Sequence, residues 1–329
     1  MVMSSDKVFP AIKDVTSSLL SKLPRAIFSW IFLSWTFGHF GALDWRFELA
    51  THFQLQYLFG AVAFGIFFAA TKQWRWLGAA SLCALISGAS VIPWYVPAPQ
   101  TASGQRIRLL FSNIFADNKQ FIAFLDLVRA ENPDLIFMQE VRSPWEKIIE
   151  KIRADYPHGL MKGFDGVGGK IVALSRLPLS KAEDAGIGDY NGPSLQLSLE
   201  HGGQTIHILT AHSLPPTDKL NLQRRDEHFD IIADRMNSLP NPKIVIGDLN
   251  VTMWSPGYKR LIERTGLINS RKGFGVAPTW PTFLPMAGIP IDHCLVSKDI
   301  RVVNTRTGPH IGSDHLPLIV DLEISAWRK

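Results

Sequence analysis

Cysteine is scarce in this chain of 329 residues, which contains only Cys83 and Cys294. The first lies in an apolar run and the second lies far away in a more polar part of the chain, so a structural disulfide is not expected. No cluster of cysteines and histidines has the spacing of a zinc site, which argues against a zinc-dependent fold. Internal repeats and low-complexity tracts are missing as well, so nothing supports a solenoid or a fibrous protein.

A strong excess of one charge is also missing. The net charge of +5 is shared between a short N-terminal part and the residues after Gly104, where acidic and basic side chains nearly balance. The high isoelectric point therefore does not indicate a nucleic-acid-binding surface. The stretch 259–272 is locally basic, and we interpret it as one solvated face of a helix.

Charged residues are absent from 26–97 outside two short breaks. Each of the three remaining apolar runs is near the roughly 20 residues that a helix needs to cross a bilayer. We expect three transmembrane helices at 26–43, 53–71 and 76–96, preceded by a cytoplasmic tail at 1–25. The second break contains Lys72 and Arg75 without an acid, so the positive-inside tendency places it in the cytoplasm and the chain after residue 97 outside.

The chain changes character after the third run. Residues 97–104 are uncharged and rich in Pro, Ala, Ser and Thr, as short linkers are. In 105–329 strand-like and helix-like stretches alternate. Strands are expected at 107–112, 135–138, 170–174, 195–199, 205–210, 243–247, 291–296, 300–305 and 317–323, and helices at 119–130, 145–154 and 221–237. This order predicts a layered α/β domain with sheets packed inside helices.

Polar side chains recur where the apolar strands end, which is where an α/β fold places its chemistry. The central example is KIVIGDLN, in which Asp248 and Asn250 follow a buried strand and can face one cleft. The other strand ends carry Asn113 (RLLFSN), Glu140 (PDLIFMQE), His212 (HILTAH), Asp292 (IDHCLVS), and Asp314 with His315 (GSDHLPL). Each alone is explained as well by a turn, a helix charge or a structural histidine. Together they predict one assembled site.

In this order, and together with GGKIVALSRLPL, these motifs resemble the endonuclease/exonuclease/phosphatase superfamily, which has the fold of deoxyribonuclease I. The resemblance covers 104–329 and implies a four-layer α/β/β/α sandwich. The apolar runs, WSP after GDLN and PTWP before IDH are similar to a bacterial membrane-anchored branch. That similarity implies a multi-pass protein of the bacterial inner membrane with its catalytic domain on the periplasmic side.

The resemblance implies a metal site by position. Glu140 would bind the ion, Asn113 would lie beside it and contact the metal or the phosphate, and Asp314 would support the metal or its waters. Since these ligands are oxygens, Mg²⁺ or Mn²⁺ is the expected cofactor.

The remaining residues receive catalytic roles from the same resemblance. Asp248 would position and deprotonate the attacking water, and Asn250 would bind a phosphoryl oxygen. His212 would donate a hydrogen bond to the phosphate or protonate the leaving oxygen. His315 would be oriented by Asp292 for acid/base work or for donation to the phosphate.

Three features bear on the substrate. Phe115 stands where nuclease members often carry an acid, which makes repair of apurinic sites doubtful. Trp280 can stack on a base or form the floor of the cleft, and we favour the floor. The stretch 283–289, FLPMAGI, is a candidate for the apolar loop that a lipid hydrolase carries near its cleft.

The sequence therefore predicts a membrane-anchored, metal-dependent phosphodiesterase that acts on nucleic acid. A phospholipid hydrolase similar to a sphingomyelinase, or a hydrolase of small phosphoesters, is an alternative. A catalytically silent membrane-bound binding module is the alternative from another class. No obligate protein partner is expected.

Overall fold

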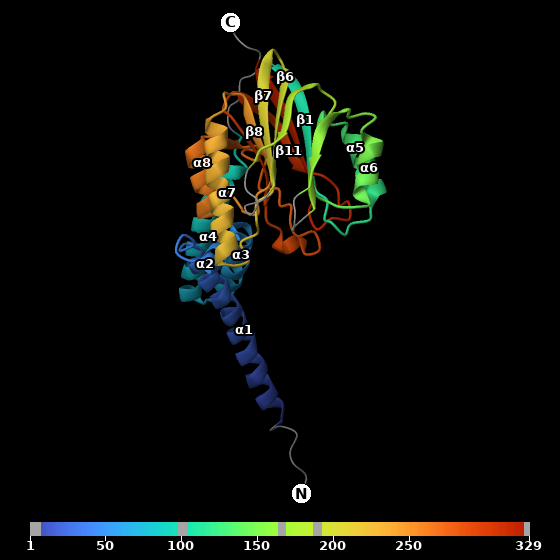
Figure 1. Cartoon of the computed structure of the whole chain (residues 1–329). Helices are drawn as coiled ribbons and strands as arrows, with labels where there is room; N and C mark the ends of the chain where they lie inside the picture. The colour runs from blue at the N-terminus through green and yellow to red at the C-terminus, as the bar shows by residue number, and fades with distance from the viewer. Residues whose placement is uncertain (1–7, 98–103, 164–168, 187–192, 326–329) are drawn as a thin grey trace.

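Two six-stranded mixed sheets face each other in the computed structural model, which describes residues 8–97, 104–163, 169–186 and 193–325 (Figure 1). The first sheet has the order β11-β12-β1-β2-β4-β3 and the second the order β5-β6-β7-β8-β10-β9. The strands of the first sheet are β1 (Gly104–Asn113), β2 (Leu135–Val141), β3 (His158–Lys162), β4 (Lys170–Ser175), β11 (Ile300–Thr307) and β12 (Leu318–Ser325). Those of the second are β5 (Leu179–Asp184), β6 (Ser194–His201), β7 (Gln204–Ala211), β8 (Lys243–Asp248), β9 (Ile268–Asn269) and β10 (Asp292–Val296).

The central strands are buried on both faces, and this is why they read as unbroken apolar runs. Successive side chains of a strand point to opposite faces. In β1, Leu109 and Phe111 therefore join the core between the sheets, whereas Leu110 joins the cluster on the outer face. Each sheet contains one parallel pair, β1 with β2 and β7 with β8, so the carboxyl ends of these strands meet at one edge.

Two pairs of helices complete the layers. Helices α5 (Phe121–Glu131) and α6 (Trp145–Ile152) cover the outer face of the first sheet, and α7 (Lys219–Asn237) and α8 (Pro256–Thr265) cover that of the second (Figure 1). The order helix, sheet, sheet, helix is the four-layer α/β/β/α arrangement predicted from the sequence.

The N-terminal part is helical, but the prediction of three transmembrane helices is not supported. Its helices are α1 (Val8–Gly38), α2 (Trp45–Thr51), α3 (Gln54–Ala70) and α4 (Trp74–Val91), followed by the short 3₁₀ helix η2 (Ile92–Trp94). Within the described residues only Trp74–Trp94, with a mean hydropathy of 1.6, is long and apolar enough to cross a membrane. Helices α2 and α3 meet the same criterion only as a pair bent by 64°.

The run predicted at 26–43 fails for a structural reason. Helix α1 already ends at Gly38, so its apolar part after Arg25 covers only about 20 Å at the helical rise, compared with the roughly 30 Å of a bilayer core. The same helix extends back to Val8, into the stretch expected to be a tail. In Figure 1 it projects away from the sandwich.

These helices pack directly on the sandwich. Glu48 of α2 is buried and binds Arg225 of α7 at 2.7 Å, and its Oε1 also accepts a hydrogen bond from Ser255. Trp254 donates from its indole nitrogen to the carbonyl of Ser90 at 3.1 Å. Most of the linker predicted at 97–104 lies outside the described residues.

Candidate active site

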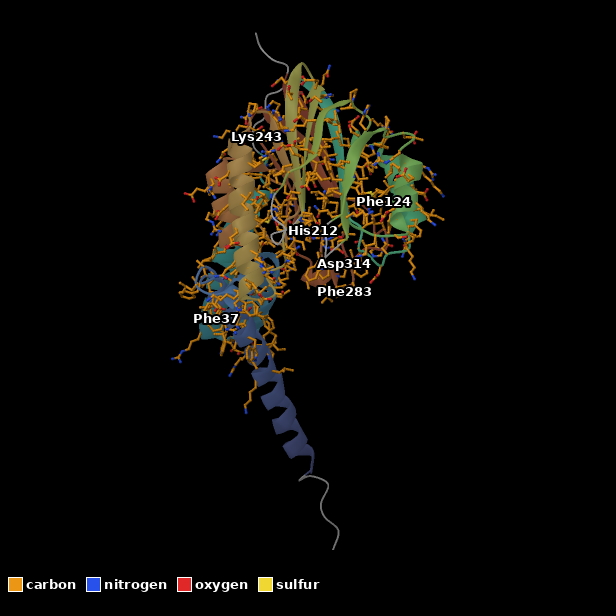
Figure 2. The ribbon with its side chains drawn as sticks, viewed as in Figure 1. Phe37, Phe124, His212, Lys243, Phe283 and Asp314 are labelled. Carbon is orange, nitrogen blue, oxygen red and sulfur yellow. The ribbon has the colours of Figure 1, made fainter. Side chains whose placement is uncertain are left out.

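The strand ends named from the sequence converge at one edge of the two sheets. Asn113 ends β1 and Asp248 ends β8, while Asp292 opens β10 and pairs with Asp248 in the ladder. His212 follows β7 directly. Figure 2 shows His212 and Asp314 near each other at the end of the sandwich that faces the N-terminal helices.

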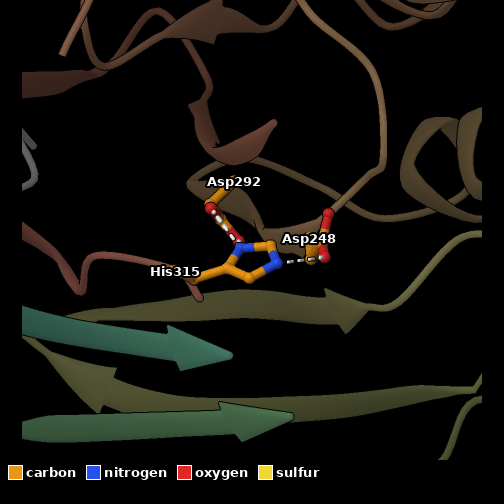
Figure 3. A group of neighbouring side chains, drawn as sticks. All are labelled: Asp248, Asp292 and His315. Atoms are coloured by element: carbon orange, nitrogen blue, oxygen red, sulfur yellow. Dashed lines mark hydrogen bonds and ion pairs between the residues drawn. The ribbon is translucent and has the colours of Figure 1, made fainter. Parts of the chain in front are cut away.

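His315 and Asp292 form a buried pair (Figure 3). His315 Nδ1 lies 2.9 Å from Asp292 Oδ2 and 3.2 Å from its Oδ1. Burial alone would lower the pKa of His315, but the charge of Asp292 and the hydrogen bond to it raise this pKa to about 10. Burial opposes ionisation of Asp292 too, yet the charge of His315 holds the pKa of Asp292 below its usual value. The pair is therefore an imidazolium beside a carboxylate at neutral pH.

Asp248 is the hub of the site. Its Oδ1 accepts a hydrogen bond from the backbone nitrogen of Asn250 at 2.9 Å. Its Oδ2 accepts from Asn113 Nδ2 at 3.2 Å and lies 3.7 Å from Nε2 of both His212 and His315. Burial and the nearby charge of Asp292 raise the pKa of Asp248 to about 8. The carboxylate is thus poised to exchange a proton near neutral pH.

Glu140 forms the more open side of the site. It has a φ of +59° at an irregularity in the pairing of β2 with β4, where the ladder shifts between Met138 and Val141. Such bulges re-aim a side chain, and here Glu140 Oε1 accepts a hydrogen bond from Asn113 Nδ2 at 2.9 Å. The Glu140 side chain is 25% exposed, whereas that of Asp248 is only 2% exposed.

The residues on this side fit a hard divalent cation, because Glu140 supplies partly exposed carboxylate oxygens. The buried carboxylates of Asp248 and Asp292 add negative charge nearby. Asp248, Asp292 and His315 also lie close enough together to hold an ion. In this cluster His315 Nδ1 is already hydrogen-bonded to Asp292 at 2.9 Å, and an ion bound between them would have to replace that bond.

The other predicted residues take different positions. His212 Nε2 lies 4.0 Å from Glu140, and burial lowers the pKa of His212, so its ring is neutral. Asn250 uses its side-chain nitrogen to bind the carbonyl of Ser213 at 2.8 Å. Asn113 presents its amide nitrogen to both carboxylates, and its oxygen accepts from the backbone of Phe115.

A hydrogen bond joins Trp280 to Asp314, the residue before His315. The indole nitrogen of Trp280 donates to Asp314 Oδ2 at 3.0 Å, so this carboxylate is engaged away from Glu140. Among the described contacts of Asp314, none reaches Glu140 or Asn113. The supporting role for Asp314 at a metal stays a prediction, and so does the placing of Trp280 at the cleft floor.

Two residues with no assigned role hold the site together. Gln139 is fully buried and bridges the sheets, since its Nε2 donates to the carbonyl of Ala211 at 2.9 Å and its Oε1 accepts from the backbone of Asp248 at 3.1 Å. A side chain at Gly247 would place its Cβ 1.9 Å from the Ala211 carbonyl oxygen, so only glycine fits there. The sequence contains a signal for Gln139, because it is a polar residue at the end of the apolar run in PDLIFMQE.

A third such residue lies behind the site. His228 of α7 is buried, and its two ring nitrogens lie 3.0 Å from the hydroxyls of Ser194 and Ser213. It supports the loop to which Asn250 binds. Nothing in its helical sequence context distinguishes it from a surface histidine.

Comparison with known proteins agrees with this geometry. Residues 110–315 match the model of the Endonuclease/Exonuclease/phosphatase family. No curated protein matches the chain in sequence. Similar solved structures include the endonuclease/exonuclease/phosphatase from Bacteroides vulgatus, with 17% identity and a TM-score of 0.57 over 67% of this chain and 100% of that chain.

Two further structures have the same fold. The catalytic domain of human nocturnin, solved with a bound sulfate anion, shares 19% identity and a TM-score of 0.56 over 67% of this chain and 94% of its own. D. rerio TDP2, solved with a single-strand DNA product, shares 15% identity and a TM-score of 0.54 over 67% and 99%. At these identities the similarity establishes the fold alone.

Proposed function

Because the chain belongs to the Endonuclease/Exonuclease/phosphatase family, we propose that it hydrolyses phosphoric diesters in a reaction that depends on a divalent metal. The observation that carries this proposal is the position of Asp248 Oδ2, which lies 3.7 Å from the Nε2 atoms of two histidines, one charged and one neutral. A carboxylate, a fixed imidazolium and a neutral imidazole around one point suit attack by water on an anionic phosphorus centre.

Asp248 accepts the proton of the attacking water in this proposal. The water oxygen bonds to phosphorus, the bond from phosphorus to the leaving oxygen breaks, and the leaving oxygen takes up a proton from solvent. His315, held as an imidazolium by Asp292, donates from Nε2 to a phosphoryl oxygen on which charge builds up. His212 donates a second hydrogen bond to the phosphate.

Glu140 would hold Mg²⁺ or Mn²⁺, assisted by Asn113 once its amide oxygen faces the ion. The ion supplies positive charge that offsets the charge of the phosphoryl oxygens. Nucleic acids and phospholipids both contain the diester bond, and the DNA product bound to D. rerio TDP2 supports a nucleic acid as one candidate substrate.

The N-terminal helices serve as a membrane anchor in this proposal, with Trp74–Trp94 as the spanning segment. Lys72 and Arg75 lie at the start of that segment, whereas Ser90 and Trp94 near its end contact the sandwich. The positive-inside tendency then supports a sandwich on the periplasmic side of a bacterial inner membrane.

One experiment tests both parts. Membranes containing the full chain are washed with alkaline carbonate and assayed with bis-p-nitrophenyl phosphate and Mn²⁺, beside Asp248→Asn and the exposed-site control Asp126→Asn. We expect the control to equal the parent and Asp248→Asn to fall at least ~100-fold, as loss of a general base does. Equal rates for Asp248→Asn would refute the mechanism, and release of the protein by the wash would refute the anchor.

A further inference from the structure

The loop 281–288 beside the site exposes three large apolar side chains. Phe283 is 76% exposed, Leu284 51% and Met286 88%. Three such neighbours on a protein surface mark a contact with another apolar body.

The base of this loop is hydrogen-bonded to the two residues that precede His315. Thr282 donates from its backbone nitrogen to the carbonyl of Asp314 at 2.9 Å and from its hydroxyl to the carbonyl of Ser313 at 2.8 Å. These two residues directly precede His315. The tip of the loop contains the 3₁₀ turn η3 (Pro285–Ala287). Figure 2 shows Phe283 beside Asp314, at the end of the sandwich nearest the N-terminal helices. The loop is therefore a fixed apolar projection next to the catalytic histidine.

The same loop is held to helix α3. Gln56, in the first turn of α3, donates from Nε2 to the carbonyl of Gly288 at 2.7 Å and to that of Met286 at 3.3 Å. The loop consequently lies at the end of α3 that contacts the sandwich.

An exposed apolar stripe continues from this contact along α3. Phe59, Val62 and Ile66 are 66%, 46% and 68% exposed, and their spacing of three and four residues places them on one helical face. Phe59 follows Gln56 by three residues, so the stripe begins where the loop is bound. The loop and the helix together present one apolar surface beside the candidate membrane span of α4.

The loop itself carries no charge that could bind a nucleic-acid backbone. Residues 278–291 contain no charged side chain. In the basic stretch 259–272, Arg264 is paired with Asp230 and Asp234 of α7 at 2.6 Å, and Arg271 is fully buried. These two arginines are occupied by ion pairing or burial within the fold, whereas binding along a nucleic acid needs exposed cations beside the site.

We propose that Phe283, Leu284 and Met286 insert into the outer leaflet beside α3, and that the site hydrolyses the phosphodiester headgroup of a bilayer lipid. This substrate class rests on the proposed diesterase function. Water adds to the headgroup phosphorus, one bond from phosphorus to an alcohol oxygen breaks, and the released alcohol takes up a proton. The products are a phosphomonoester and an alcohol, one of which stays in the membrane.

Insertion is tested without catalysis. The full chain carries an environment-sensitive nitrobenzoxadiazole label at Met286→Cys. The control carries it at Ile122→Cys on α5, where Ile122 is 73% exposed on the side of the sandwich away from the N-terminal helices (Figure 1). Each is placed in nanodiscs of phosphatidylethanolamine and phosphatidylglycerol containing doxyl-labelled lipid. We expect at least ~2-fold stronger quenching at 286 than at 122. Equal quenching would overturn the insertion of the loop.

The substrate class is tested by a ratio of rates. The variant Phe283→Ser/Leu284→Ser/Met286→Ser and the control Ile122→Ser are assayed on nanodisc lipid, bis-p-nitrophenyl phosphate and single-stranded DNA. We expect the ratio of lipid to small-diester hydrolysis to fall at least ~10-fold in the loop variant and to stay unchanged in the control. Partial unfolding would lower both rates equally and would therefore leave this ratio unchanged.

The outcomes separate the two proposals. A parent protein that cleaves DNA but not lipid would overturn the lipid assignment while leaving the diesterase intact. A loop variant with an unchanged ratio would overturn the role of the loop in lipid hydrolysis. A parent without activity on any diester would overturn the proposed function, and the quenching measurement would still decide whether the loop enters the bilayer.

Discussion

The two sides of the site differ in their exposure to solvent. On one side Glu140 and Asn113, from the first sheet, form an oxygen-rich face whose carboxylate is a quarter exposed. On the other, Asp292 is fully buried and His315 is 5% exposed. On the histidine side the charge of Asp292 outweighs the effect of burial and raises the pKa of His315 to about 10, so the ring stays protonated at neutral pH. The open side keeps a carboxylate available for an exchangeable cation. We call these the histidine side and the carboxylate side.

The largest effect is expected on the histidine side. His315→Gln removes the fixed imidazolium and should lower the rate on bis-p-nitrophenyl phosphate by about 10²- to 10⁴-fold. The Mn²⁺ concentration for half-maximal activity should stay the same, because the proposed mechanism places the ion at Glu140 and not at His315. The measurement is a metal titration of the initial rate.

The matched control for this change is His310→Gln, in an exposed position on the same loop. It should leave both quantities at the parent values. A rate above half that of the parent in His315→Gln, with normal circular dichroism, would contradict the role of His315.

A smaller and different effect is expected on the carboxylate side. Glu140→Gln keeps the shape of the side chain but removes its charge, so the Mn²⁺ concentration for half-maximal activity should rise at least ~10-fold, with partial recovery at high Mn²⁺. Calorimetric titration of Mn²⁺ measures the same change without turnover. Glu146→Gln, which loses only a half-exposed pair with Lys170, is the control. An unchanged Mn²⁺ affinity in Glu140→Gln would place the ion elsewhere.

The smallest effect concerns stability in acid. Burial, with the charge of His212, lowers the pKa of His228 to about 3 from the ordinary 6.5. Between these values the unfolded chain binds the additional proton. The contribution of His228 is therefore complete above pH 6.5 and is lost as the pH falls, by up to about 1.4 kcal/mol per pH unit. The free energy of unfolding of His228→Gln should depend less steeply on pH from 6.5 to 4 than that of the parent. An identical slope would show that another group carries the acid sensitivity.

Most of the sandwich could be predicted from the sequence, because its central strands are buried on both faces. The apolar runs at 107–112 and 135–138 lie in β1 and β2. The strands that escaped prediction, β3, β5 and β9, are outer strands of their sheets. The first two have largely exposed or half-exposed side chains and no apolar run, and β9 is only two residues long. Helix α8 was predicted only as a solvated helical face within 259–272, and its start was missed although Ser255 with Pro256 is a helix-start signal.

The gathering of the site residues could also be predicted, because strand ends share one edge. The contacts that hold them could be predicted only in part. A polar Gln139 at the end of an apolar run is a visible signal, but its bond to the Ala211 carbonyl and the close fit at Gly247 depend on the approach of the two sheets, which a linear pattern does not contain. Of the three predicted membrane spans only the third, at 76–96, coincides with a candidate span, because hydropathy does not reveal that a helix ends at Gly38 or that the chain bends between α2 and α3.

The seam between the N-terminal helices and the sandwich makes the chain less modular than its sequence suggests. Leu249 and Val251, which flank Asn250 in the loop after β8, belong to the same apolar cluster as Val91 at the end of α4. Cutting the chain near residue 104 would thus remove apolar neighbours of the loop that carries Asn250. In the proposed membrane anchor, any change in the tilt of α4 would therefore act mechanically on that loop.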